Sequence, residues 1–166
     1  MPQLAIETSC DDTCAAVLDG GAVLSSVVSC QEAHSKFGGV VPEVASRHHL
    51  ELITPVIEKS LADAGVGLDD IDSVAVTAGP GLIGALLVGL SAAKAIAAPR
   101  RLPLVPTDHL HGHVAANFLE PDAIEPPFIC LIASGGHTLI AGVTSHEGFE
   151  ILGETLDDAA GEALDK

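Results

Sequence analysis

The sequence is poor in aromatic and basic residues. It contains no Trp and no Tyr, and aromatic residues make up 2% of its 166 residues, although hydrophobic residues make up 48%. A hydrophobic core must therefore consist of Val, Ile, Leu and Ala. Seven Lys and Arg stand against 23 Asp and Glu, which gives a net charge of −16. Because such a charge repels phosphate backbones, nucleic-acid binding would require a local basic patch or a partner protein.

Recognisable targeting, membrane and thiol motifs are also missing. The first twelve residues, MPQLAIETSCDD, contain neither a basic region nor a long apolar region, so we expect no signal peptide and a cytoplasmic protein. The longest apolar run, residues 81–98, is interrupted by Ser91 and Lys94 and predicts a buried helix rather than a membrane span. The cysteines show no CxxC spacing, and we expect small core thiols, although the first two could bind a metal. They are Cys10, Cys14, Cys30 and Cys130.

The order of apolar runs and turns predicts a mixed α/β fold with a repeated pattern. Strands, some with the glycine turn that ends them, are expected at residues 3–7, 13–21, 22–30, 72–81, 102–107, 128–136, 137–148 and 149–155, and helices at residues 42–65, 82–98, 108–120 and 156–166. In the first helix Val44, Leu50, Ile53 and Ile57 recur at helical spacing, and Pro55 predicts a kink or a break.

Residues 128–156 repeat the strand order of residues 3–30. We therefore predict a first domain at residues 1–120, a linker at 121–127 and the beginning of a second domain of the same kind at 128–166. The second domain would be incomplete, so we expect the chain to be a fragment. Two like domains with a cleft between them would form a natural nucleotide site, because glycine turns present backbone N–H groups to phosphates.

Three histidines in residues 107–120, TDHLHGHVAANFLE, suggest metal binding. On a helix His109 and His113 share one face, whereas His111 lies about 200° away from His109. A pair of histidines four residues apart is a common metal-binding arrangement, but solvated histidines on an ordinary helix explain the spacing equally well. The motif is not the HExxH of zinc proteases, because Leu110 follows His109. No third ligand is evident from the sequence.

Three turns and one basic segment are further candidates. Residues 7–13, ETSCDDT, gather three carboxylates that could hold a cation or orient a phosphate, or simply form a polar hairpin. Residues 133–138, ASGGHT, and residues 77–86, TAGPGLIGAL, could bind phosphate through backbone N–H groups, or their glycines could serve turns and close packing. Residues 36–49 concentrate basic side chains and are either a basic patch or a solvated segment.

Taken in order, ETSCDDT, FGGVVPEVASRHH, TAGPGLIGALLVG, DHLHGH, ASGGHT and LGETLDDAAGEALDK resemble the N-terminal half of the tRNA threonylcarbamoyladenosine-forming family, formerly called glycoproteases. The resemblance covers essentially the whole chain. It implies an actin-like, sugar-kinase-like fold of two duplicated RNase H-like domains, the first complete and the second truncated. It also implies an acyltransferase that moves a threonylcarbamoyl group from its adenylate to the amine of the adenosine 3′ of the tRNA anticodon.

The resemblance assigns roles to individual residues. His109 and His113 match the family's metal histidines, which implies one divalent metal, Fe2+ or alternatively Zn2+. Asp12 matches a carboxylate that faces the phosphate region, as does Asp11, which we expect to take the proton of the adenosine amine. The segment expected to line the adenylate site is Ile132, Ala133, Ser134, Gly135 and Gly136, and Asp165 matches an acidic substrate contact. Lys36 and Arg47 are expected to contact tRNA.

The resemblance also implies partners, namely a degraded paralogue of the same fold and a small ATPase in a bacterial-type complex, with no membrane. Since family members are roughly twice as long, we expect this fragment alone to be inactive. The alternatives are a non-catalytic paralogue that serves as a scaffold, a sugar-kinase-like ATPase and a metalloprotease. Metal content distinguishes the first of these from the transferase.

Overall fold

The computed structural model describes residues 1–30, 41–119, 122–133 and 137–165, without the side chains of residues 162, 164 and 165. It divides into two compact units, Met1–His109 and Leu110–Lys166, which are called unit 1 and unit 2 below. Both units are mixtures of strands and helices, as predicted.

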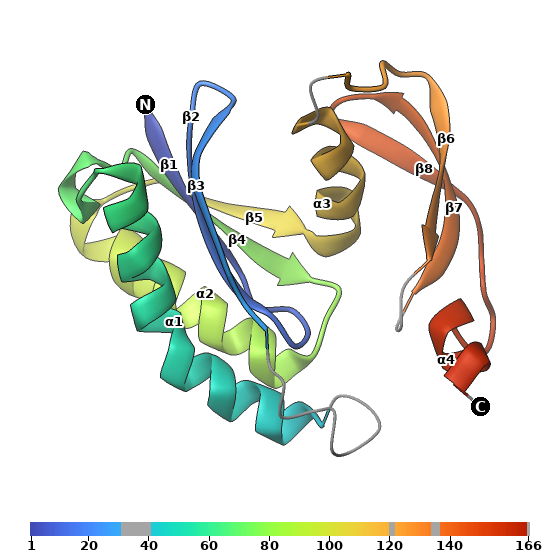
Figure 1. Ribbon diagram of the computed structural model, residues 1–166, viewed down its shortest axis with the longest axis horizontal. Coiled ribbons are helices and arrows are strands. Elements are labelled where there is room, and N and C mark those ends of the chain that lie inside the picture. The colour runs from blue at the N-terminus through green and yellow to red at the C-terminus, as the bar shows by residue number, and fades with distance from the viewer. Residues whose placement is uncertain (31–40, 120–121, 134–136, 166) are drawn as a thin grey trace. The chain divides into compact units, whose positions relative to one another are not determined.

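Unit 1 contains a five-stranded sheet in the order β3-β2-β1-β4-β5 (Figure 1). The strands are β1 (Pro2–Glu7), β2 (Thr13–Asp19), β3 (Ala22–Ser29), β4 (Ser73–Gly79) and β5 (Leu104–Asp108). The first three strands pair in antiparallel fashion and form a meander. In contrast, β1, β4 and β5 run parallel, so their carboxyl ends lie at the same edge of the sheet.

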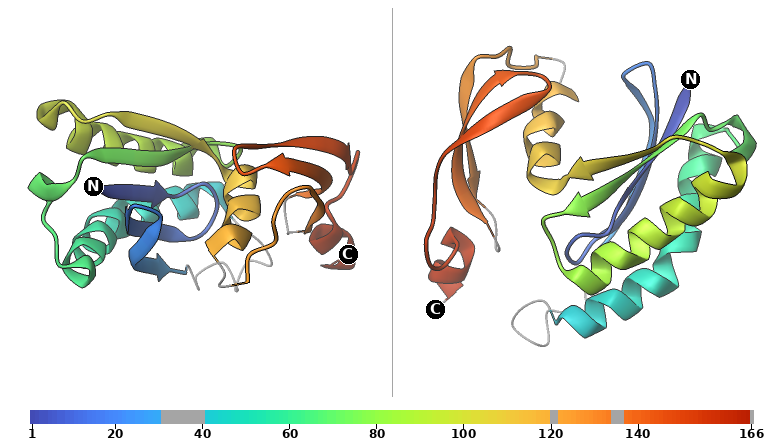
Figure 2. Two further views of the ribbon diagram at one scale, coloured as in Figure 1. Left: turned by 90° about the horizontal axis from the view of Figure 1, so that it is seen from above. Right: turned by 180° about the vertical axis from the view of Figure 1, so that it is seen from behind.

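Two long helices, α1 (Pro42–Ala64) and α2 (Ile83–Arg100), pack against each other and cover one face of this sheet (Figures 1 and 2). Proline is tolerated in the first turn of a helix, and α1 begins at Pro42. It ends at Gly65, whose φ of 70° is left-handed and favours glycine. The expected break at Pro55 does not occur, since α1 continues through it. A short 3-10 helix, η2 (Leu68–Asp70), precedes β4.

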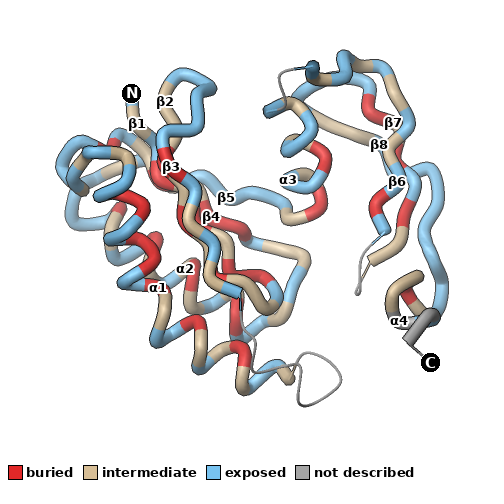
Figure 3. The backbone as a smooth tube through the Cα atoms, viewed as in Figure 1, coloured by how far each residue is buried: buried red, intermediate tan, exposed pale blue. Residues whose placement is uncertain are grey.

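The core of unit 1 lies between the sheet and the two helices (Figure 3). Every buried hydrophobic side chain in the described part of the chain is Val, Ile, Leu or Ala, as the lack of aromatics predicts. The expected apolar face of α1 is partly wrong. Ile53 and Ile57 are buried, but Leu50 is 68% exposed and His49 is fully buried instead.

Helix α2 is less buried than its composition predicts. It buries only small residues, namely Ala85, Gly89, Ala93 and Ala97. Ile83 and Leu87 are exposed, whereas Val88, Leu90 and Ile96 are partly buried against the core of unit 1. Among the described residues, α2 is the one helix long and apolar enough to cross a membrane. Length and composition are weak evidence for a span, since a core helix of a soluble protein passes the same test.

Unit 2 contains a three-stranded antiparallel sheet in the order β6-β7-β8. Its strands are β6 (Phe128–Ala133), β7 (Thr138–Ser145) and β8 (Gly148–Glu154). The predicted repeat of the first strand order is therefore confirmed. The remaining elements are α3 (His109–Ala115), which starts at the last residue of unit 1, η3 (Ala116–Leu119) and α4 (Ala160–Asp165).

Unit 2 begins at Leu110, within α3. The domain bounds of 1–120 and 128–166, with a linker at 121–127, stay a prediction. Leu110 and Val114 of α3 pack with side chains of β6 and β7, so the helix shares the core of unit 2 rather than unit 1. The expectation of core thiols holds only for Cys130, which is half-buried against the core of unit 2. No disulfide joins the four cysteines, but Cys10 and Cys30 are exposed and the other two are only half-buried.

Candidate functional site

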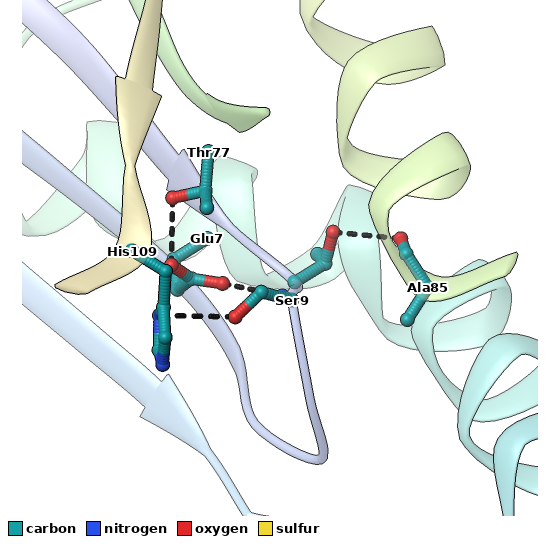
Figure 4. Close-up of polar contacts among 6 residues, drawn as sticks. Glu7, Ser9, Thr77, Ala85 and His109 are labelled. Carbon is teal, nitrogen blue, oxygen red and sulfur yellow. Dashed lines mark hydrogen bonds and ion pairs between the residues drawn. The ribbon is translucent and has the colours of Figure 1, made fainter. Parts of the chain in front are cut away.

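Three polar side chains meet at the carboxyl edge of the parallel strands of unit 1 (Figure 4). Glu7 is the last residue of β1, Thr77 lies near the end of β4, and His109 directly follows β5. The Thr77 hydroxyl donates a 2.6 Å hydrogen bond to Oε2 of Glu7, and the same oxygen lies 3.1 Å from Nδ1 of His109. The sheet order therefore joins residues that are 102 positions apart in the sequence.

These contacts fix the orientation of the His109 ring. An ionised carboxylate only accepts hydrogen bonds, so Nδ1 of His109 carries the proton that it donates to Glu7. The hydroxyl oxygen of Ser9 lies 3.0 Å from the same nitrogen, and the Ser9 backbone N–H donates to Oε1 of Glu7. This arrangement makes Nε2 the ring nitrogen that can hold a metal, in the manner of the carboxylate–histidine pairs that support metal sites.

The electrostatics of the pair agree with its geometry. Burial of Glu7 opposes its ionisation, but hydrogen bonds from His109, Thr77 and Ser9 outweigh burial and lower its pKa to about 2. The hydrogen bond to Glu7 raises the pKa of His109 above its usual value, against the effect of burial. Glu7 is therefore ionised at neutral pH, and a metal that binds His109 must compete with a proton.

The segment between Glu7 and β2 is held tightly against the start of α2. The Thr8 hydroxyl donates a 2.8 Å hydrogen bond to the carbonyl of Ala85, and the Leu82 N–H donates one of 2.8 Å to the carbonyl of Ser9. A Cβ at Gly81 would lie 2.5 Å from that same Ser9 carbonyl oxygen. Close packing therefore explains this glycine of the TAGPG turn, while phosphate binding there stays a prediction.

Asp11 and Asp12 lie in the turn between β1 and β2, and both are half-buried. The two carboxylates affect the pKa values of the neighbouring thiols of Cys10 and Cys14. Partial desolvation of the sulfur, although the residue is exposed, and then the charge of Asp11 raise the pKa of Cys10 to about 11. Burial, followed by the charge of Asp12, raises the pKa of Cys14 to about 12. These cysteines are therefore protonated at neutral pH and are weak nucleophiles and metal ligands in this state.

The second predicted metal histidine, His113, lies four residues after His109 on α3, and its side chain is exposed. His111 is half-buried and meets the ring of Phe149 edge-on at 5.7 Å. Imidazole nitrogens are donors for divalent metals, and a metal held by His109 and His113 stays a prediction. No group of three or more His, Cys, Asp or Glu suited to a metal occurs in the part of the chain that the structure describes.

The other predicted site residues are distributed as follows. At the end of β6, Ile132 is buried and Ala133 is exposed. Arg47 is exposed and forms a 2.7 Å ion pair with Glu43 one turn earlier on α1. Lys36, Ser134, Gly135 and Gly136 lie outside the described residues, as does the side chain of Asp165, whose backbone ends α4.

Glu7 as a partner of His109 is the main feature that the sequence patterns did not reveal. From the sequence alone, its carboxylate belongs to the acidic turn at residues 7–13. The available signal was that Glu7 and His109 each follow a buried strand. To use that signal, one must know that β1 pairs with β4 and that β4 pairs with β5. Residues 3–30 alone do not specify these pairings.

Comparison with known proteins shows what this arrangement is related to. Residues 22–166 match the family model TsaD, described as tRNA N6-adenosine threonylcarbamoyltransferase. Proteins of that name from Clostridium perfringens and Clostridium beijerinckii are 58% and 53% identical to the chain over 165 residues, which are 98% of this chain and 49% of each relative. The chain thus spans about half the length of the curated relatives it matches.

Solved structures support the fold. YeaZ from Pseudomonas aeruginosa has a TM-score of 0.64 at 20% identity and covers 93% of this chain and 66% of its own. The ROK hexokinase from Thermus thermophilus has a TM-score of 0.52 at 17% identity, over 92% of this chain and 49% of its own. These neighbours place the α/β architecture in the actin-like, sugar-kinase-like class. Because the family model matches most of the sequence, the chain belongs to the tRNA N6-adenosine threonylcarbamoyltransferase family.

Proposed function

We propose that this chain is part of an enzyme that transfers a threonylcarbamoyl group from threonylcarbamoyl-adenylate to the N6 amine of the adenosine 3′ of the tRNA anticodon. Membership of the family supports the reaction class. The observation that carries the proposal for these residues is the Glu7–His109 contact at the ends of three parallel strands. The edge outside the carboxyl ends of strands is where open α/β sheets usually bind ligands.

His109 and His113 would hold one divalent metal, Fe2+ or alternatively Zn2+. Such a metal supplies a Lewis acid that polarises a carbonyl oxygen. Glu7 keeps the His109 proton on Nδ1, and Thr77 donates to the same carboxylate oxygen. Glu7 and Thr77 would therefore act through His109 rather than on the substrate.

In the transfer, the amine nitrogen forms a bond to the carbamoyl carbon, and the bond from that carbon to the adenylate phosphate oxygen breaks. The amine loses a proton, which Asp11 would accept, and AMP leaves. Asp12 would face the phosphate region. Ile132, Ala133, Ser134, Gly135, Gly136 and Asp165 would line the adenylate site, and Lys36 and Arg47 would contact tRNA.

The likeness to curated relatives of twice the length makes the partners part of the proposal. A paralogue of the same fold and a small ATPase would assemble with the full-length protein in the cytoplasm. The strong negative charge of the chain supports a need for partners, since tRNA is repelled by it.

The test is a transfer assay on the full-length protein with these partners, in which nucleosides from digested tRNA are identified by mass spectrometry. Asp11→Asn should lower the rate about 100-fold or more if Asp11 is the base, because general-base catalysis contributes about that much. Asp63→Asn is the matched control, since Asp63 is an exposed carboxylate in an ion pair with Lys59 on α1.

Metal content separates the transferase from a non-catalytic scaffold. His109→Ala should abolish bound iron or zinc, measured by elemental analysis of the purified protein. A wild-type protein with neither transfer activity nor metal would favour the scaffold. Full metal retention in His109→Ala would exclude His109 as a ligand, even if transfer activity is found.

A further inference from the structure

A buried imidazole connects α1 to the acidic turn, and no role has been assigned to it so far. His49 lies in the N-terminal half of α1 and its exposed fraction is 0%. Its Nδ1 lies 2.8 Å from the hydroxyl oxygen of Thr13, and its Nε2 lies 3.0 Å from the carbonyl oxygen of Cys10. Both contacts lie within unit 1.

The two partners determine the tautomer of His49. A carbonyl oxygen can only accept a hydrogen bond, so Nε2 must carry the proton that it donates to Cys10. In the neutral ring Nδ1 then accepts a hydrogen bond from the Thr13 hydroxyl, which is itself fully buried. Both ring nitrogens are satisfied, and a fully buried imidazole requires this because an unpaired polar group is costly to bury.

The contacts bracket the turn that carries the two carboxylates. The carbonyl of Cys10 belongs to the planar peptide group that also contains the N–H of Asp11, so fixing this oxygen fixes the backbone on the N-terminal side of Asp11. Thr13, the first residue of β2, anchors the other side. Only Asp11 and Asp12 lie between these two anchors.

We propose that His49 is a positioning residue, which holds the turn from Cys10 to Thr13 and thereby places the carboxylates of Asp11 and Asp12. Its effect on the turn is independent of the reaction, whereas its effect on transfer rests on the proposed function. The 23-residue helix α1 provides the support, because Ala45 and Ile53 on the same helix are buried in the unit 1 core.

Two substitutions separate positioning from simple filling of the core. Glutamine can place an amide N–H near the position of Nε2 and keep the hydrogen bond to Cys10. Asparagine can place a carbonyl oxygen near the position of Nδ1 and keep only the hydrogen bond from Thr13. His49→Gln and His49→Asn both bury a primary amide in place of the ring, but the first keeps the contact to Cys10 and the second keeps the contact to Thr13.

The first experiment is nuclear magnetic resonance on the isotope-labelled protein. In the wild type, long-range ¹H–¹⁵N spectra should show His49 as the neutral tautomer with the proton on Nε2, and the opposite tautomer would overturn the proposal. In His49→Asn the amide signals of Asp11 and Asp12 should shift and exchange with solvent about tenfold faster or more, as expected for the loss of one hydrogen bond. His49→Gln loses the Thr13 contact but keeps the Cys10 contact, so the Asp11 amide should stay close to the wild type, and a change at Asp11 as large as in His49→Asn would refute positioning through Cys10.

The second experiment measures transfer by the full-length protein. His49→Asn should lower kcat about tenfold, with the KM for tRNA within about twofold, because one misplaced group costs about that much in rate. His49→Gln should recover most of the loss. Equal kcat values for the two variants would contradict the proposal. If His49→Asn does not fold, the tautomer of His49 in the wild type still tests the proposal. Full activity of Asp11→Asn would instead show that Asp11 is not the base. The magnetic resonance measurements would then test the positioning of the turn on their own.

Discussion

The first and second strand meanders share a strand order but differ in how they are covered. Leu4 and Ile6 of β1 are 0% and 2% exposed, whereas Ile129 and Leu131 of β6 are 67% and 65% exposed. Three antiparallel strands require a packed apolar face to be stable. In unit 1 the helices α1 and α2 cover the face of the sheet that carries Leu4 and Ile6. In unit 2 the side chains of α3 pack with Ile132 of β6, while Ile129 and Leu131 alternate with it and lie on the opposite, exposed face. The order of strands and turns therefore determines the three-stranded meander, whereas the helices that pack on it determine which of its residues are buried.

The largest expected effect is a loss of stability when Leu4 of the first meander is replaced by alanine. The same change at Leu131 of the second meander is the comparison. Leu4→Ala should lower the free energy of unfolding of unit 1 by about 2–5 kcal/mol, because it leaves a cavity in a closed core. Leu131→Ala should change unit 2 by about 0.5 kcal/mol or less, because its side chain is already solvated. Hydrogen exchange followed by mass spectrometry reads both units separately. Equal losses would mean that the exposed face of β6 is covered in solution.

A second prediction compares two glycines. A Cβ at Gly81 would lie 2.5 Å from the Ser9 carbonyl oxygen, whereas one at Gly142 of β7 would lie 3.5 Å from Cδ1 of Leu152. Gly81→Ala should therefore destabilise unit 1 by about 1–3 kcal/mol, since backbone must move to relieve the contact. Gly142→Ala should be neutral within about 0.5 kcal/mol. Urea denaturation measures both, and a neutral Gly81→Ala would refute the close packing of this turn.

Local patterns predicted most of the elements for a simple physical reason. Apolar spacing and helix-ending residues such as Pro42 and Gly65 act within a few residues, and α1 has the predicted ends. The same spacing placed Leu50 in the core, but α1 presents His49 there because Thr13 and Cys10 satisfy its ring. Which side of a helix is buried depends on the partners that the sheet brings to it.

The candidate site was less predictable, because it depends on contacts between distant strands. The histidine pair was visible from its spacing, and the acidic turn from its three carboxylates. The contact of Glu7 with His109 depends on the parallel order β1-β4-β5, which hydrophobic spacing alone does not encode. For the same reason, α3 could be placed with unit 2 only after Leu110 and Val114 were seen to pack with β6 and β7.

A third prediction compares a carboxylate at a strand end in each unit. Glu7→Gln keeps the shape of the side chain but removes the charge that orients His109, so the affinity for Zn2+ or Fe2+ should fall about 10–100-fold. Glu154→Gln, at the exposed end of β8, should leave it unchanged. Isothermal titration of the full-length protein measures both. Unchanged affinity in Glu7→Gln would show that the contact does not support a metal.

The smallest effect concerns charge, in which the two units also differ. Lys166 is the one Lys or Arg after His109 in the sequence, so the other six, and with them any basic contact to tRNA from residues 1–165, belong to unit 1. Arg47 and Lys59 both lie on α1 in exposed ion pairs with a carboxylate four residues away. Such pairs contribute at most about 1 kcal/mol, so replacing either with Ala should barely change stability.

Binding of tRNA should distinguish Arg47 from Lys59. If Arg47 contacts a tRNA phosphate, Arg47→Ala should weaken binding of the full-length complex a few-fold and reduce the slope of log affinity against log salt by about 1. Lys59→Ala should change neither. The matched pair isolates position from charge, because both variants remove one positive charge and free one carboxylate on the same helix. Equal salt slopes in the two variants would show that the net charge of unit 1, and not Arg47 itself, governs the encounter with tRNA.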